Sequence, residues 1–370
     1  MIIENIRYLD KNYKLVKGKI EYNNGYFTEI TGTETRDAKT DIIIPGMVDI
    51  HTHGCGGVDP MECDEKEFEK MAMCYAQNGT TTFLATTLTD DFNKIKNTVK
   101  KVSKVMKKNL FGARVAGVHM EGPHFAGDEY IGANNARYVR KLNIPEMKEL
   151  INLYPNVIKI EDVDPTLEGA EEYIRTFKQF YNISLGHTSA DFECAKKAFL
   201  FGAKNITHSF NGMKPLHHRH PNMIGAAFNS NVFMEIICDG FHIHPEIIKI
   251  AYKLAGAERL SFISDSLCSM GAEEGEYVIG GLKTIVKNNE ARLEDGTICG
   301  GMTPLYRQVL NAVSYGIPFN MAVKCATLTP ARAAGIDDVC GSIEEGKLAD
   351  FLVLNKDYEL KSVYVGGREI

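Results

Sequence analysis

The chain has 370 residues, of which 44% are hydrophobic, and it carries a formal net charge of −6 with a pI near 6.0. This composition predicts a globular protein with a large core, and the excess of acid argues against a nucleic-acid-binding surface. The length exceeds that of most single domains, so one large domain plus a small one fits best. Basic pairs such as Lys100-Lys101 and Lys107-Lys108 lie in a helical pattern and indicate a solvated helix face.

Neither end of the chain predicts a targeting or membrane segment. The first residues, MIIENIRYLDK, carry charges inside the apolar stretch, and no uncharged run of 18 residues follows anywhere. Nine cysteines are scattered without C-x-x-C pairs, which favours reduced thiols in the cytoplasm. Cys55 lies beside a histidine pair and could be a ligand, although a thiolate next to His-x-His is uncommon.

Both termini have the alternating pattern of short β-strands. Residues 1 to about 45 contain MIIENIRYL, KLVKGKIEYN and GYFTEITG, with Asn23-Asn24-Gly25 as a tight turn, and residues 350–354 and 361–368 have the same pattern. Neither end can bury a core alone. We therefore expect residues 1–46 and 345–370 to form one small β-sandwich domain.

Between the ends, strand and helix patterns alternate. The strand candidates are Val48–His51, Thr81–Leu88, Arg114–Met120, Val157–Val163, Ile183–His187, Lys204–His208, Val232–Cys238 and Leu260–Asp265. The helical stretches include Asp64–Gln77, Asp91–Lys108, Glu168–Tyr181, Ala190–Phe201, Pro245–Leu254, Thr303–Tyr315 and Asn320–Ala334. Eight apolar strands alternating with helices predict an α/β fold, a (β/α)8 TIM-like barrel over residues 47–344. An insertion at Glu276–Gly301 has the glycine pairs of a hairpin.

The stretch IIIPGMVDIHTHGCGG at residues 42–57 places two histidines at the end of the first barrel strand. Side chains at positions i and i+2 of a strand point to the same side, so His51 and His53 can bind one cation together. Gly54, Gly56 and Gly57 let the backbone turn and leave room for a ligand. Alone, a His-x-His at a strand end is also consistent with coincidence.

Further ligand-type residues follow other barrel strands, at the end where such barrels carry their chemistry. These residues are Glu121, His187, His208 and Asp265, after the third, fifth, sixth and eighth strands. Taken singly, each histidine could be a core residue, but together they predict a site for two divalent ions. Water bound to such an ion ionises near neutral pH, and Asp265 could accept its proton and return it to a leaving amine. The pattern predicts a metal-dependent hydrolase of an amide or a related bond.

Seven motifs in this order resemble the amidohydrolase superfamily: PGMVDIHTHG, HMEGP, GHTSA, THSFNGM, CDGFHIHP, FISDS and GSIEEGKLADFLVL. The carboxylate in HMEGP distinguishes the chain from relatives whose metals are bridged by a carboxylated lysine. With THSFNGM and CDGFHIHP, it resembles the branch that hydrolyses N-acetylglucosamine 6-phosphate to glucosamine 6-phosphate and acetate.

The resemblance implies a role for each matching residue. Glu121, His187 and His208 would form a primary metal site, and His51 and His53 would complete a second site that not every member keeps. One or two divalent ions per subunit are therefore expected, with Zn2+ favoured and Fe2+ or Mn2+ as alternatives. Asp265 would be both a metal-site residue and the catalytic acid and base.

The resemblance also implies a substrate site. Asn211, the backbone at Gly212 and His242 would meet the sugar phosphate, and Arg219 would reach a phosphate across a homodimer interface. A surface salt bridge is the alternative for Arg219. A helix-start position before Pro245 is the alternative for His242 and His244.

The chain departs from the family pattern at the acetyl and sugar side. Asn134 stands where the family has a carbonyl-polarising histidine, and His124 is an extra imidazole that could compensate, although packing is its simpler role. Asp164-Pro165-Thr166 replaces Ala-Pro-Glu, and Gly300–Pro304, with Met302, also differs. N-acetylgalactosamine 6-phosphate or another N-acyl amine is therefore an alternative substrate.

Other classes fit less well. A sugar-phosphate sensor without catalysis would be expected to lack a member of the metal and acid–base set, yet all are present. The P-C-x-x-C signature of zinc deaminases is absent, and so is a G-x-G-x-x-G after a strand.

Overall fold

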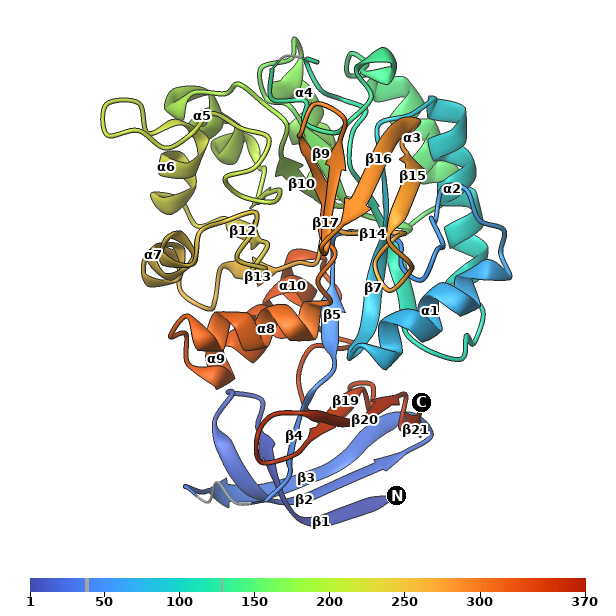
Figure 1. The fold of residues 1–370 in the computed structure, drawn as a ribbon, viewed down its shortest axis with the longest axis vertical. Coiled ribbons are helices and arrows are strands. Elements are labelled where there is room, and N and C mark those ends of the chain that lie inside the picture. The colour runs from blue at the N-terminus through green and yellow to red at the C-terminus, as the bar shows by residue number, and fades with distance from the viewer. Residues whose placement is uncertain (37–39, 128) are drawn as a thin grey trace.

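The computed structural model describes residues 1–36, 40–127 and 129–370 of the chain. A barrel of strands and helices stands on a sheet built from both termini, so that both ends of the chain lie in that sheet (Figure 1). No helix in the described part of the chain is long and apolar enough to cross a lipid bilayer.

The terminal sheet has seven strands in the order β21-β20-β19-β4-β1-β2-β3. They are β1 (Ile2–Leu9), β2 (Leu15–Asn23), β3 (Tyr26–Glu34), β4 (Ile42–Pro45), β19 (Phe351–Leu354), β20 (Leu360–Val365) and β21 (Arg368–Glu369). β4 pairs parallel with β1 and antiparallel with β19, which joins the two ends of the chain. The composite β domain is confirmed, and its strands form one continuous mixed sheet. The positive φ of Asn24 (51°) and Gly25 (87°) fits the expected tight turn.

Eight parallel strands form the barrel, in the order β13-β12-β11-β10-β9-β8-β7-β5. They are β5 (Met47–Asp49), β7 (Thr80–Thr87), β8 (Arg114–Met120), β9 (Ile158–Val163), β10 (Asn182–Leu185), β11 (Asn205–Ile206), β12 (Phe233–Ile236) and β13 (Leu260–Phe262). The first and last barrel strands are joined through the residues that follow them. There β6 (Thr52–His53) pairs with β14 (Ser266–Leu267), and Asp265 N–H donates to the His51 carbonyl at 3.0 Å. The predicted barrel is confirmed, and its first and last strands carry predicted site residues side by side.

Helices surround the strands. They are α1 (Glu67–Gln77), α2 (Phe92–Val105), α3 (Ile144–Leu153), α4 (Ala170–Phe177), α5 (Phe192–Phe201), α6 (Asn222–Phe228), α7 (Pro245–Ala255), α8 (Leu305–Ser314), α9 (Phe319–Cys325) and α10 (Leu328–Ala333), with a 3-10 turn at Ala136–Tyr138. α2 buries Ile95, Val99 and Val102 and exposes Lys100, whereas Lys101 is half-buried and donates to the carbonyl of Cys63. Lys107 and Lys108 are exposed, but they lie beyond the end of the helix. The stretch expected as one helix over 320–334 is two, because the backbone leaves the helical conformation at Thr327.

The insertion after the eighth strand is larger than the predicted hairpin. It is a four-stranded antiparallel sheet of β15 (Gly275–Ile279), β16 (Leu282–Lys287), β17 (Glu290–Leu293) and β18 (Ile298–Gly300). Its strands lie toward the end of the barrel away from the terminal sheet, as the orange ribbons in Figure 1 show. A Cβ at Gly280, in the first turn of this sheet, would lie 3.2 Å from Leu88, which follows β7. The sheet therefore packs against the residues at the carboxyl end of the barrel.

The cysteines differ from expectation at one pair. Cys55 and Cys74 form a disulfide, whereas the sequence favoured reduced thiols throughout. The Gly54–Gly57 turn, with positive φ at Gly54, Gly56 and Gly57, brings Cys55 against α1, where Cys74 lies. Since its sulfur bonds to Cys74, Cys55 is not placed as a metal ligand. The other seven cysteines are free.

Candidate metal centre

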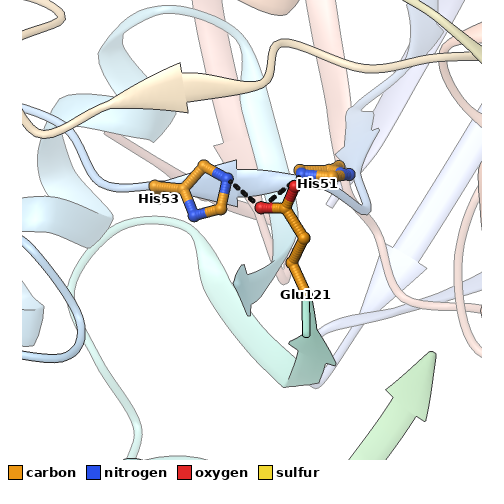
Figure 2. A group of neighbouring side chains, drawn as sticks. All are labelled: His51, His53 and Glu121. Carbon is orange, nitrogen blue, oxygen red and sulfur yellow. Dashed lines mark ion pairs between the residues drawn. The ribbon is translucent and has the colours of Figure 1, made fainter. Parts of the chain in front are cut away.

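Glu121, at the end of β8, faces the two histidines of the first barrel strand. Its Oε2 lies 3.0 Å from Nε2 of His53 and 3.6 Å from Nε2 of His51. Figure 2 shows both imidazole rings converging on this carboxylate. All three side chains are buried, so each is held away from bulk water.

The second oxygen of Glu121 faces a different histidine pair. Oε1 lies 2.7 Å from Nε2 of His187 and 3.3 Å from Nε2 of His208, and those two nitrogens are 3.0 Å apart. Two triads of potential ligands therefore share one carboxylate: His51, His53 and Glu121 form the first, and Glu121, His187 and His208 form the second. In each triad the ligand atoms lie within 4.8 Å of one another.

Asp265 completes the group on the side of the first triad. Its Oδ1 is 3.3 Å from Nε2 of His53 and 3.5 Å from Nε2 of His51. The structure thus brings together the six residues that the sequence predicted as metal-site residues, from strands as far apart as the first and the eighth.

The donor set fits a divalent cation. His51 Nε2 is buried and has no hydrogen-bond partner among the described residues, and it lies 3.5–3.6 Å from two carboxylates. That separation is long for a direct hydrogen bond, whereas a bridging cation would satisfy the nitrogen and both acids. Imidazole and carboxylate together suit zinc and also iron or manganese.

Without a metal, the carboxylates and imidazoles of the site shift one another's pKa values. Burial alone would raise the pKa of Glu121, but hydrogen bonds from His187 and His208 and the nearby imidazoles of His51 and His53 hold that pKa well below its usual range. Burial opposes charging of His53, yet Asp265 and Glu121 raise its pKa to about 9. Burial likewise opposes ionisation of Asp265, but His53 and His51 hold its pKa below the ordinary value. Asp265 is therefore a carboxylate at neutral pH, as a general base requires.

The site residues depart from strand geometry where they enter the site. His187, His208 and Asp265 have φ values of 45°, 25° and 48°, in the left-handed region. Non-glycine residues there are strained, and such strain clusters at functional sites. It also explains why β10, β11 and β13 end before the histidines and the aspartate that the sequence placed inside them.

Glu235, in the middle of β12, supports ligands of both triads and was missed from the sequence. Its Oε2 lies 3.0 Å from Nδ1 of His51 and accepts the backbone N–H of His208 at 3.2 Å, while Oε1 accepts from Asn205 at 2.7 Å. A carboxylate on the far nitrogen of a ligating imidazole fixes its tautomer and orientation. The signal was a single glutamate inside the apolar run VFMEIIC.

Four of the triad residues line a cavity of about 440 Å³: His53, Glu121, His187 and His208. Asn134 lines it, with Nδ2 3.1 Å from Nε2 of His187 and 3.5 Å from Oε1 of Glu121. The Asn134 Oδ1 accepts the backbone N–H of Thr89 at 3.0 Å, which turns the amide nitrogen toward the site. His124 is fully buried, pairs with Glu161 at 2.8 Å and is not among the lining residues. Asn134 therefore lies in the cavity beside His187 and Glu121, and His124 lies outside the cavity lining.

Three predicted sugar-side residues line the same cavity: Asn211, Gly212 and His242. Nδ1 of His242 lies 2.6 Å from Asp239, and its buried Nε2 has no hydrogen-bond partner in the part of the chain that the structure describes. His244 instead caps α7 by accepting the backbone N–H of Glu246 at 3.2 Å, so the helix-start role belongs to His244.

Two other predicted substrate residues lie outside the cavity lining. Arg219 is exposed on a loop, 2.8 Å from the neighbouring His218, and Met302 is buried with its sulfur 3.2 Å from the hydroxyl of Ser269. Cys299 and Gly300 line the cavity in place of Met302. The roles of Arg219 and Met302 stay predictions.

A (β/α)8 barrel that gathers buried imidazoles around a shared carboxylate at its strand ends has the form of a metal-dependent hydrolase. The chain belongs to the amidohydrolase family, which it matches over residues 42–370. It is 32% identical over 329 residues to an N-acetylglucosamine-6-phosphate deacetylase of Vibrio furnissii, a match that covers 88% of this chain and 82% of the relative.

A second relative and a solved structure extend the comparison. The chain is 32% identical over 336 residues to an N-acetylgalactosamine-6-phosphate deacetylase of Escherichia coli O157:H7, covering 90% of this chain and 88% of the relative. The crystal structure of N-acetylglucosamine-6-phosphate deacetylase from Thermotoga maritima superposes with a TM-score of 0.91 at 31% identity and covers 100% of this chain and 99% of the other. The chain is thus an amidohydrolase similar to deacetylases of N-acetylated amino-sugar phosphates.

Proposed function

We propose that the protein hydrolyses N-acetylglucosamine 6-phosphate to glucosamine 6-phosphate and acetate. The observation that carries this proposal is the convergence, in one cavity, of the Glu121 triads with Asp265 and Asn134. These supply metal ligands, a base and a hydrogen-bond donor, which are the parts that amide hydrolysis requires.

Glu121, His187 and His208 would hold one divalent ion, and His51 and His53 would hold a second with Glu121. Zn2+ is the proposed ion, with Fe2+ and Mn2+ as alternatives. A divalent ion in such a site lowers the pKa of a water and polarises the amide carbonyl.

The side chains around the ions move the protons and hold the acyl group. Asp265 accepts the proton of the attacking water and delivers it to the amine nitrogen as the C–N bond breaks. Asn134 donates from Nδ2 to the acetyl oxygen, where negative charge develops, because its Oδ1 is already fixed by Thr89. His242, Asn211 and the backbone of Gly212 bind the sugar phosphate.

The galactosamine isomer is the alternative substrate, since relatives with either activity are equally similar to this chain. The experiment is acetate release from both N-acetylhexosamine 6-phosphates and from unphosphorylated N-acetylglucosamine, with and without a chelator. Chelator-sensitive turnover with the highest kcat/KM for the glucosamine phosphate supports the proposal. A higher kcat/KM for the galactosamine isomer would establish the alternative, and absence of acetate from all three would contradict both.

We also propose a homodimer in which Arg219 contacts the phosphate of the partner's substrate. The exposed position of Arg219 is compatible with that role. Light scattering after size exclusion tests the dimer, and a monomer would contradict it. A cytoplasmic location stays a prediction, which fractionation of cells would test.

A further inference from the structure

An arginine from the inserted sheet lines the wall of the catalytic cavity. Of the described residues that line this cavity, Arg292 on β17 is the only lysine or arginine. The motif-based site of the sequence analysis did not include it, because Arg292 lies in the insertion. Its neighbour Ala291 is fully buried, so the strand that carries Arg292 is anchored in the core.

In the described part of the chain, the guanidinium of Arg292 is hydrogen-bonded through two of its three nitrogens. Its Nε donates to Glu290 at 3.0 Å and its Nη1 donates to the carbonyl of Gly296 at 2.7 Å. Its central carbon lies 4.9 Å from the centre of the Phe241 ring, which supports one face of the group. In the described part of the chain Nη2 makes no hydrogen bond, so this donor pair is free for an anion.

A second unused donor belongs to the residue after Phe241. Within residues 1–36, 40–127 and 129–370, the buried Nε2 of His242 has no hydrogen-bond partner, while its Nδ1 is fixed by Asp239. His242 also lines the cavity, and its ring centre is 5.6 Å from that of Phe241. Arg292 and His242 thus both lie near the ring of Phe241, and both line the same cavity.

We propose that Arg292 and His242 of one chain bind the 6-phosphate of the substrate together, so that the sheet β15–β18 is a specificity element. The inference rests on the proposed function and adds a residue to it. A guanidinium suits a phosphate because its planar donors match two phosphate oxygens, and it keeps this capacity while paired with Glu290. The phosphate contact would then come from the same chain that supplies the metal ligands, whatever Arg219 adds from a partner.

The test compares Arg292→Met and Arg292→Lys with a matched control, Lys283→Met. Lys283 lies on β16 of the same sheet, pairs with Glu276 and Glu294 at 3.1 and 3.3 Å, and does not line the cavity. For Arg292→Met we expect KM for the sugar phosphate to rise about 10-fold with little change in kcat, because the lost contact stabilises the bound substrate and the transition state equally. Activity on unphosphorylated N-acetylglucosamine should not change. Arg292→Lys should recover part of the loss, and Lys283→Met should resemble the wild type.

Several results would overturn the inference. An unchanged ratio of kcat/KM values for phosphorylated and unphosphorylated sugar in Arg292→Met, with wild-type thermal stability, would show that Arg292 makes no phosphate contact. An equal loss in Lys283→Met would attribute the effect to net charge.

Calorimetry with glucosamine 6-phosphate and glucosamine separates this inference from the proposed function. If the wild type releases no acetate, the proposed deacetylase function is wrong. The inference still stands if the wild type binds the phosphorylated sugar more tightly and Arg292→Met does not. It falls if the wild type shows no such preference.

Discussion

Oε2 of Glu235 lies 3.0 Å from Nδ1 of His51, the ring nitrogen other than the one that faces Glu121. The same carboxylate oxygen accepts the backbone N–H of His208, so one buried side chain supports ligands of both triads. Replacing Glu235 should therefore weaken metal binding at two places at once.

We expect Glu235→Leu to lower metal affinity by about 10- to 100-fold, as is typical when the partner of a ligating histidine is lost. Glu235→Gln should lose less, because its amide oxygen can still accept from Nδ1 of His51. Competition against a chromogenic chelator measures the affinity. Glu161→Gln is the matched control, since Glu161 is equally buried but bonds to His124, Tyr173 and Tyr181. Equal losses of affinity in the two glutamine variants would indicate a general effect on the fold.

Asp265→Asn should lower kcat by about 100- to 10,000-fold while the chain keeps its fold and its metal, because an amide cannot accept the proton of the attacking water. Acetate release gives kcat, and elemental analysis gives the metal content. Asp90→Asn, which removes a buried aspartate paired with Lys94 outside the cavity, should stay near the wild-type rate. Asp265→Asn with near wild-type kcat would contradict the assigned base.

Asn134 is predicted to act through its amide nitrogen. Asn134→Asp keeps the size and the acceptor for Thr89 N–H but replaces the donor with a carboxylate beside Glu121. We expect kcat to fall about 100-fold or more, as on removal of an oxyanion-stabilising donor. Asn134→His, which restores the family residue, should retain more activity than Asn134→Asp. The reverse order of the two rates would rule out donation by this side chain.

Metal affinity should rise with pH. In the metal-free chain the pKa of His53 is about 9, raised by Asp265 and Glu121, so at neutral pH the ring carries a proton that it must lose to bind a metal. At pH values below that pKa, the metal must displace the His53 proton, and the apparent metal affinity falls by up to about 10-fold for each unit by which the pH is lowered. Chelator competition between about pH 6.5 and 8.5 should show a rising affinity. A flat profile would mean that His53 is neutral before the metal binds.

The sequence predicted much of the barrel and the gathering of six potential ligand residues at one end of it, because their signals are local. Apolar strands of regular spacing end in His51, Glu121, His187, His208 and Asp265, and strand order alone brings these ends to one face. Exact strand ends were missed because His187, His208 and Asp265 adopt left-handed backbone conformations that tertiary contacts impose.

What the sequence did not predict depends on contacts between distant segments. The Cys55–Cys74 disulfide spans 19 residues and requires that a glycine turn pack against α1. Arg292 could be assigned to the cavity only once the insertion was seen to be a four-stranded sheet rather than a hairpin. Glu235 had a signal, a charge inside an apolar strand, but its partners come from other strands.

The most direct test of the account is acetate release from N-acetylglucosamine 6-phosphate by chelator-stripped protein as a divalent metal is added back. We predict no turnover in the stripped protein, and recovery that saturates at one or two bound ions per chain, with kcat of Asp265→Asn at least about 100-fold lower at the same metal content. Full activity of stripped protein, or no acetate from metal-loaded protein, would contradict the assignment of this site as the catalytic centre of an amino-sugar-phosphate deacetylase.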